Sequence, residues 1–341
     1  MMSEKKQSHG TYVFENGPVI ISSACVAGQK EGEGPLVSGI DYIETDAYAG
    51  EKNWEAAESA MQTKALQFAM DKAGYHPEDI DVMLAGDLLS QTIASSFGLK
   101  DFQIPLMGLY GACSTIGEAI ALASMLISGN VMQNVAAVTS SHFAGAEKEF
   151  RFPLNYGNQR PLSATWTVTG SAAFIIADRS RSVVDAVGIH AVTLGTVVDF
   201  GVKDAMNMGA CMAPAAADTL ERHFVNTHTT PEDYDWIFTG DLGFVGQKIL
   251  VELMQEAGFD IGKKHRDCGI EIYDHDRQDT HAGGSGCACS AVTLAAYILP
   301  QMLFGKWHRI LFVPTGALLS QISFQEGQSI PGIAHAVELY I

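Results

Sequence analysis

The sequence predicts a duplicated α/β protein. Its two halves, each ordered strand, helix, strand, helix, strand, would stack into a five-layer α/β/α/β/α body. Two observations lead to this prediction. Short segments that are apolar throughout alternate with helical segments, which is typical of parallel sheets covered on both faces. In addition, residues 77–88 (PEDIDVMLAGDL) recur as residues 231–242 (PEDYDWIFTGDL), with Pro, Glu, Asp, Gly and Leu at the same places.

A second match supports the duplication. Residues 112–114 and 288–290 both read Ala-Cys-Ser. Continued without a gap, this alignment pairs further identical residues, Gly129 with Gly305 and Thr139 with Thr315. We therefore expect an N-terminal half at residues 1–180 and a C-terminal half at residues 181–341. An inserted segment at about 144–169 has no counterpart in the second half.

Local patterns justify the elements in order. We expect strands at 18–28, 82–85, 135–139, 171–177 and 310–315, and an extended segment at 182–194. Helices are expected at 55–74, with Gly74 as its C-cap, after residue 114, and at 215–225. The remaining long stretches predict loops: a surface loop at 29–53 and a Met-rich loop at 204–214.

Composition narrows the class of function. The formal net charge of −18 argues against nonspecific nucleic-acid binding and against docking on anionic lipid by charge. An anionic ligand would therefore need a local cationic group. Six scattered cysteines without a signal peptide predict a reduced, intracellular setting, and the C-x-C at 287–289 does not predict zinc. The best apolar run, 291–305, is too short to span a bilayer.

The turn at residues 111–115 (GACST) leads into a helix that is apolar nearly all round, which predicts burial. Ser114 or Thr115 is the candidate N-cap. A helix N-terminus lowers the pKa of a thiol, so Cys113 is a candidate nucleophile. The alternative is that Cys113 is a small buried apolar residue.

Polar and small residues follow several predicted strands, and in open α/β sheets ligands bind at the carboxyl ends of strands. These residues are therefore expected to converge. They are Gly86-Asp87, Cys113, residues 140–142 (Ser-Ser-His), Gly240-Asp241, residues 281–285 and Thr315-Gly316.

With these motifs in place, the chain resembles the thiolase superfamily and, within it and from end to end, the stage V sporulation protein AD family of spore-forming bacteria. The motifs that carry the resemblance are GACST at 111–115, FRFP at 150–153 with YG at 156–157, WTVTG at 166–170, HAGGSG at 281–286 and FVPTGALLS at 312–320. The resemblance implies a thiolase-like fold.

Acyl-condensing members of this superfamily use a Cys nucleophile with two His, or with His and Asn. By resemblance, Cys113 matches the nucleophile and His281 the thiolase His. The segment that carries the His of ketoacyl synthase III matches residues 235–240, where that position reads Gly240, followed by Asp241. The Asn-bearing position falls near Gly284. Two polar members of the constellation are then missing, which favours a protein that does not condense acyl groups.

The resemblance implies non-catalytic binding of dipicolinic acid (pyridine-2,6-dicarboxylate), alone or as its calcium chelate, as it moves into or out of spores in sporulation and germination. Implied partners are the other stage V sporulation A membrane proteins, which would hold the chain at the inner spore membrane, and a second copy in a homodimer. No cofactor is expected beyond Ca²⁺ carried by the ligand. The alternatives are an acyl-thioester condensing or thiolytic enzyme that uses Cys113, and a scaffold for spore membrane proteins.

Candidate ligand-binding residues combine these arguments. Arginine offers a bidentate fork to a carboxylate, and a tyrosine ring can stack on a pyridine. The candidates are Cys113, His281, His142, Arg151, Tyr156, Arg160, Gly240, Asp241, Gly284 and Thr315.

Each class of candidate has a structural alternative. Loop capping would explain His281, and a place in a turn would explain His142. Interface contacts or ion pairs between loops would explain the arginines. Asp241 has the same place in the repeat as Asp87, which favours capping of the turn after each strand. We expect no metal site, because the acidic loop Asp274 to Asp279 lacks the EF-hand pattern.

Overall fold

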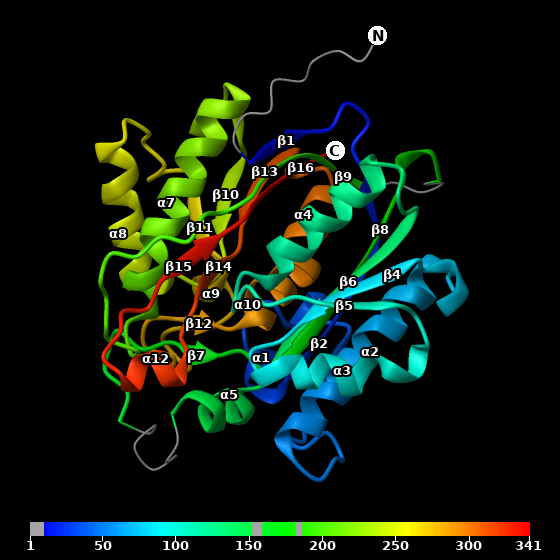
Figure 1. Cartoon of the computed structure of the whole chain (residues 1–341), viewed down its shortest axis with the longest axis horizontal. Coiled ribbons are helices and arrows are strands. Elements are labelled where there is room, and N and C mark those ends of the chain that lie inside the picture. The colour runs from blue at the N-terminus through cyan, green and yellow to red at the C-terminus, as the bar shows by residue number, and fades with distance from the viewer. Residues whose placement is uncertain (1–9, 152–158, 182–185) are drawn as a thin grey trace.

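The computed structural model describes residues 10–151, 159–181 and 186–341 (Figure 1). The strands are β1 (Thr11–Val13), β2 (Val19–Gly28), β3 (Tyr42–Glu44), β4 (Val82–Gly86), β5 (Leu106–Gly108), β6 (Asn134–Ser141), β7 (Trp166–Thr167), β8 (Gly170–Ala177), β9 (Val187–Thr193), β10 (Trp236–Thr239), β11 (His265–Asp267), β12 (Gly284–Ser285), β13 (Arg309–Val313), β14 (Thr315–Ala317), β15 (Gly332–Ala334) and β16 (Ala336–Tyr340). The helices are α1 (Gln29–Gly32), α2 (Trp54–Ala73), α3 (Ile93–Leu99), α4 (Thr115–Ser128), α5 (Phe143–Phe150), α7 (Met208–Thr227), α8 (Gly243–Glu256), α9 (Cys268–Glu271), α10 (Cys287–Thr293), α11 (Leu299–Leu303) and α12 (Gln321–Gln325).

The order of strands shows the duplication. One half reads β5-β4-β6-β8-β2, and the other reads β11-β10-β13-β16-β9. Corresponding strands occupy the same places, and the halves join where β2 pairs with β9. The expectation of parallel sheets is wrong for one strand in each half: β8 and β16 run antiparallel to both of their neighbours. The hydrophobic pattern could not reveal this, because a strand buried on both faces reads the same in either direction.

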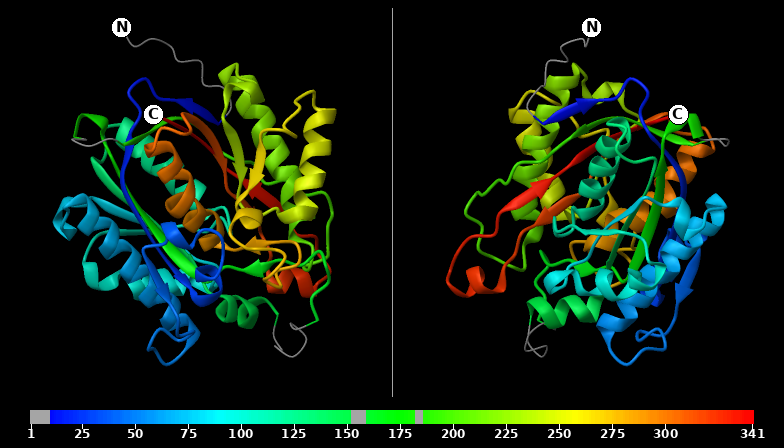
Figure 2. Two further views of the ribbon diagram at one scale, coloured as in Figure 1. Left: turned by 180° about the vertical axis from the view of Figure 1, so that it is seen from behind. Right: turned by 45° about the vertical axis from the view of Figure 1, so that its right-hand side comes forward.

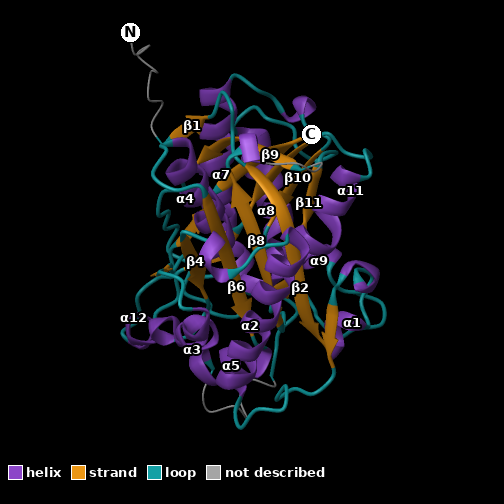
Figure 3. Cartoon of the chain, turned by 90° about the vertical axis from the view of Figure 1, so that its right-hand side faces the viewer, coloured by secondary structure: helices purple, strands orange, loops and turns teal. Residues whose placement is uncertain are grey.

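Helices cover the sheet in layers (Figures 1 and 2). In the N-terminal half, α2 packs on β2, β6 and β8, and α3 packs against α2. In the C-terminal half, α7 and α8 pack together on the outer side. Between the two halves, α4 and α10 touch each other, and α4 contacts strands of both halves. The arrangement is the predicted five-layer body, seen along another direction in Figure 3.

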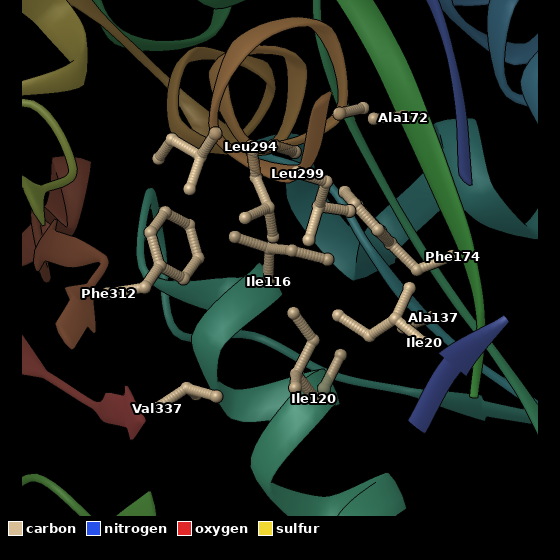
Figure 4. Packing of buried hydrophobic residues seen from close by; sticks show 14 of the residues in the cluster. Ile20, Ile116, Ile120, Ala137, Ala172, Phe174, Leu294, Leu299, Phe312 and Val337 are labelled. Atoms are coloured by element: carbon tan, nitrogen blue, oxygen red, sulfur yellow. The ribbon is translucent and has the colours of Figure 1, made fainter. Parts of the chain in front are cut away.

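The central layer is closed by apolar side chains from both halves (Figure 4). Ile116 and Ile120 of α4 lie in one buried cluster with Phe174 of β8, Phe312 of β13 and Val337 of β16. All five side chains are fully buried. Helix α4, which begins two residues after Cys113, is therefore anchored in this core.

Two predicted loops contain regular structure. The stretch expected as a Met-rich loop instead begins helix α7 at Met208, because the Asn207 side chain accepts a hydrogen bond from the Ala210 N–H and caps the helix. Pro214 lies inside this helix. The expected surface loop at 29–53 contains α1 and β3. By contrast, the helix predicted at 55–74 is found as α2, and Gly74 adopts the left-handed C-cap conformation.

Candidate functional site

A cavity opens beside Cys113, at the carboxyl ends of the central strands. The space between its walls is about 550 Å³ when the mouth is included. Most of this space lies close to protein atoms, so the cavity is narrow. Its wall is mostly apolar, with four hydroxyl groups, one thiol and one guanidinium. The lining residues are Leu88, Tyr110, Ala112, Cys113, Ala146, Phe150, Arg151, Thr165, Thr167, Met208, Met212, Ser285, Ala317 and Leu319.

The turn that carries Cys113 is held by its own hydroxyl groups. Ser114 Oγ donates to the Gly111 carbonyl at 2.6 Å, and Thr115 Oγ1 donates to the Ala112 carbonyl at 2.6 Å. Ser114 is the N-cap residue of α4, as predicted, but its hydroxyl does not accept the capping hydrogen bond that the prediction assumed. Both side chains instead fix the backbone in which Ala112 has a positive φ of 50°. This holds Cys113 against the cavity.

The environment of Cys113 favours the neutral thiol. Burial raises its pKa well above the ordinary value, and the negative charge of Asp241 raises it further. The expected lowering by the helix N-terminus is therefore outweighed. A thiol that stays protonated is a poor nucleophile, because the thiolate is the reactive form.

Asp241 lies behind the cavity wall and accepts hydrogen bonds from residues that are far from it in the sequence. Its Oδ2 accepts hydrogen bonds from Ser285 Oγ at 2.7 Å and from the Gly286 N–H at 3.1 Å, and its Oδ1 accepts one from Thr315 Oγ1 at 2.8 Å. Ser285 Oγ in turn lies 3.9 Å from Cys113 Sγ. Cys113, Ser285 and Asp241 thus form a row from the cavity into the interior.

The repeat predicts that Asp87 and Asp241 both cap turns, but in the structure only Asp87 does so. Asp87 accepts from the Leu89 N–H at 2.9 Å and caps its own turn. The turn after β10 is capped by Asp267 instead, which accepts from the N–H groups of Leu242 and Gly243. Asp241 is thereby free to face Ser285, so turn capping is right for Asp87 and wrong for Asp241.

Arg151 is the cation on the cavity wall among the described residues. It follows the last residue of α5, and its Nη1 pairs with Glu147 one helical turn earlier. Its side chain is largely buried, with 17% exposed. A planar guanidinium fixed in this way can donate to a carboxylate that enters the cavity.

His281 and Arg160 do not line the cavity. The His281 ring contacts the Pro161 carbonyl at 2.8 Å and the Asp279 carboxylate at 2.9 Å. Arg160 also pairs with Asp279, at 3.1 Å, and lies over the ring of Trp166. These side chains bind loops to one another. The described part of the cavity wall contains no histidine.

His142 caps helix α5 and faces a different surface pocket. Its Nδ1 accepts from the Gly145 N–H at 3.4 Å, so Nε2 carries the proton and donates to the Ala47 carbonyl at 2.8 Å. Burial lowers its pKa and favours this neutral ring. His142 is therefore a turn residue that also caps a helix, and it does not line the Cys113 cavity.

Gly240, Gly284 and Thr315 support the site from behind. A Cβ on Gly240 would stand 2.7 Å from the Thr315 backbone nitrogen, and one on Gly284 would stand 2.9 Å from the Ile272 side chain. The polar groups beside Cys113 belong to the next residues along the chain, Asp241 and Ser285. Polar side chains therefore stand beside Cys113 although Gly240 and Gly284 themselves offer none. Tyr156 lies outside the described residues.

Three residues of the cavity wall were not among the candidate ligand-binding residues: Thr165, Thr167 and Ser285, the last within the stretch 281–285 that was expected to converge there. Ser285 and Thr167 face one another because β12 pairs with β7, a two-residue contact between distant segments. Ser285 lies in the motif HAGGSG and Thr167 in the motif WTVTG, so both had a sequence signal. Thr165 belongs to no such motif.

Comparison with known proteins identifies the family. The family model of stage V sporulation protein AD matches residues 8–340. Stage V sporulation protein AD of Bacillus subtilis (strain 168) is 43% identical over 327 residues, which cover 96% of this chain and 95% of that protein. The chain belongs to the stage V sporulation protein AD family. A member of this family has a role in sporulation and is associated with the spore.

Solved structures show the fold that the stage V sporulation protein AD family shares with other proteins. The 3-oxoacyl-[acyl-carrier-protein] synthase III of Aquifex aeolicus has a TM-score of 0.57 at 14% identity, covering 95% of this chain and 100% of that one. A variant of OleA from Xanthomonas campestris has a TM-score of 0.61 at 13% identity, covering 97% and 100%. The thiolase-like fold is thus confirmed.

The described residues offer neither a metal site nor a membrane-spanning helix. Across these ranges, no group of three or more His, Cys, Asp or Glu side chains could hold a metal ion. Within the same ranges, every helix is too short or too polar to cross a bilayer.

Proposed function

We propose that this chain binds dipicolinic acid in the Cys113 cavity without catalysing a reaction. The observation that carries the proposal is Arg151, a cation held on the wall of a cavity whose other surfaces are apolar or hydroxyl-bearing. An aromatic dicarboxylate has matching parts: a flat apolar ring and carboxylates that a guanidinium can bind by two hydrogen bonds. Phe150 and Leu88 supply apolar contact for the ring, and Thr165 and Thr167 supply hydroxyl groups.

The chemistry of the cavity favours binding over acyl transfer. Cys113 is held as a thiol, and its polar neighbour Ser285 already donates its proton to Asp241. A nucleophile needs a base that removes its proton, whereas burial and the negative charge of Asp241 beside Cys113 raise the pKa of the thiol and keep it protonated. We therefore keep acyl transfer as the outcome that would overturn the proposal.

Titration calorimetry with dipicolinate tests the proposal directly, in EDTA and in added calcium chloride. Benzene-1,3-dicarboxylate, which has the same carboxylate spacing but no ring nitrogen, is the control ligand. Arg151→Gln should weaken dipicolinate binding roughly 10- to 100-fold, the value of one hydrogen bond to a charged group. Arg160→Gln is the matched control and should leave the affinity unchanged. Absence of heat up to millimolar ligand, with and without calcium, would refute the proposal.

The enzyme alternative has its own assay. The chain is incubated with acyl-coenzyme A, and its intact mass is measured. We expect no adduct. A covalent acyl group that disappears in Cys113→Ser would show that the thiol reacts and would replace binding with catalysis as the function.

We further propose that two copies pair along β5 and that other stage V sporulation A membrane proteins hold the chain at the inner spore membrane. Strand β5 is an edge of the sheet, and Leu106 and Met107 are exposed on it, as edges that pair with a partner require. Leu106→Lys should then convert a dimer to a monomer in light scattering. A tagged chain should copurify with those membrane proteins from spores.

A further inference from the structure

The pair of Ser285 and Asp241 sets which kind of group the inner end of the cavity offers to a ligand. Ser285 lines the cavity, and its hydroxyl proton points away from it, to Asp241 Oδ2 at 2.7 Å. The oxygen therefore turns lone pairs toward the cavity. A carboxylate arriving there would meet an acceptor rather than a donor, which is repulsive.

The charges around the cavity do not balance a dianion. Arg151 is its described cation, and Glu147 already pairs with it. Asp241 adds a negative charge behind Ser285. A ligand with two carboxylates thus enters a site in which Glu147 already neutralises Arg151 and the carboxylate of Asp241 has no positive partner among the contacts described above.

The hydrogen-bond donors to Asp241 are neutral groups. They are the hydroxyls of Thr315 in β14 and Ser285 in β12, the Gly286 N–H before α10 and the Cys113 thiol. The titratable groups that act on it, or on which it acts, are one carboxyl and four thiols: Asp267 at the end of β11, Cys113 before α4, Cys268 of α9, and Cys287 and Cys289 of α10. The largest influences on the pKa of Asp241 are its own burial, which raises it, and hydrogen bonds from neutral donors, which lower it.

We propose that the cavity takes up one proton from solvent together with each aromatic dicarboxylate dianion, and that Asp241 receives this proton. The protonated Asp241 donates to Ser285 Oγ, and the Ser285 hydroxyl turns its own hydrogen to the ligand carboxylate. One O–H bond forms on Asp241, the Ser285 O–H bond stays intact, and the site gains one positive charge. The coupling rests on the proposed function and assigns Ser285 and Asp241 to the ligand site.

Burial makes this protonation accessible. Because Asp241 is fully enclosed, desolvation raises its pKa above that of an exposed aspartate, despite its hydrogen bonds. The Ser285 oxygen and the carboxylate are already at hydrogen-bond distance, so reversing the direction of the bond requires rotation of a hydroxyl and no movement of the backbone.

Calorimetry in buffers of different ionisation enthalpy measures the coupling. Dipicolinate is titrated into the full chain at pH 7.5 in phosphate and in Tris, both with EDTA. The observed enthalpy should differ between the buffers by an amount that corresponds to uptake of about one proton per ligand. The ligand carboxylates stay ionised between pH 6 and 9. As the pH rises through this range, the affinity for dipicolinate should weaken by up to about tenfold per pH unit.

Three variants locate the proton. Asp241→Asn, whose amide can donate to Ser285 as the protonated acid would, should bind with no proton uptake and an affinity independent of pH. Ser285→Ala should bind more weakly and also lose the uptake. Thr165→Val is the control, because it removes a cavity hydroxyl that does not contact Asp241, and it should keep the uptake. Melting temperatures show which variants fold.

The outcomes separate the two proposals. Binding of dipicolinate with the same enthalpy in both buffers overturns the coupling and leaves the proposed function standing. Uptake that persists in Asp241→Asn also overturns it. Absence of binding overturns the proposed function and the coupling together.

Discussion

Acidification should destabilise this protein through a buried histidine beneath the ligand site, His265. The ring lies between two partners: it accepts from Gln247 Nε2 at 3.3 Å and donates to Thr239 Oγ1 at 2.9 Å. Thr239 donates in turn to Asp267 at 2.6 Å, and Asp267 caps the turn that leads to Asp241. A proton added to His265 would remove the acceptor from this chain of bonds.

The size of the effect follows from the pKa. Burial lowers the pKa of His265 from its ordinary 6.5 to about 4. A histidine that is held neutral stabilises the fold fully above pH 6.5, and this contribution is lost as the pH falls toward 4, because the unfolded chain binds the proton first. Linkage gives a loss of about 2 kcal/mol at pH 5 and about 3 kcal/mol once the folded histidine is also protonated.

Urea unfolding of the wild type and of His265→Gln at pH 8 and pH 5 isolates this contribution. Glutamine can also donate to Thr239 and accept from Gln247, but it does not titrate. We expect the wild type to lose about 2 kcal/mol more than the variant between the two pH values. Equal losses in both proteins would show that His265 does not govern acid stability, and the argument from its burial would be wrong.

Three further predictions concern other buried groups. Burial and the charge of Asp87 raise the pKa of Glu58 well above its ordinary value, so its ionised form destabilises the fold as the pH rises; Glu58→Gln should raise the urea midpoint at pH 8 but not at pH 4, and a lower midpoint at pH 8 would contradict this. Phe312→Ala should cost about 3–5 kcal/mol in urea unfolding, because it opens a cavity between the halves; a loss below about 1 kcal/mol would mean that the central layer is not tightly packed. Iodoacetamide at pH 7.5 should modify Cys113 at least about ten times more slowly than free cysteine, because burial raises the pKa of its thiol. Peptide mass mapping measures the rate, with Cys113→Ser as control, and a rate equal to that of free cysteine would show that Cys113 is a reactive thiolate.

The parts of the fold that local pattern determines were predictable from the sequence. The repeat of residues 77–88 led to the duplication, and the apolar run after residue 114 led to the buried helix α4. Strand direction was not predictable, because β8 and β16 carry the same apolar residues in either orientation. The start of α7 was missed because its cap, Asn207, precedes methionines and a proline that resemble a loop.

The sequence predicted the position of a cavity residue only where its turn or its chemistry points to a single place. Cys113 and Arg151 were placed correctly at one cavity, the first by its turn and the second by its chemistry. His281 and Arg160 were not, because a ring or guanidinium beside a loop serves equally well to bind that loop to Asp279. The row from Cys113 through Ser285 to Asp241 joins three segments far apart in sequence, and no local pattern specifies their meeting.

Strand β9 carries both ends of the chain, and this has a mechanical consequence. Thr193 faces Thr11 of β1 in one pairing and Ala336 of β16 in the other, and β1 and β16 both run antiparallel to β9. The chain enters beside one end of β9 and leaves from Tyr340, opposite Gly188 at the other end. Tension between the two termini is therefore directed along the strands, where the hydrogen bonds lie across the load and must break together. Pulled by its ends, the molecule should resist extension strongly and then yield in a single step.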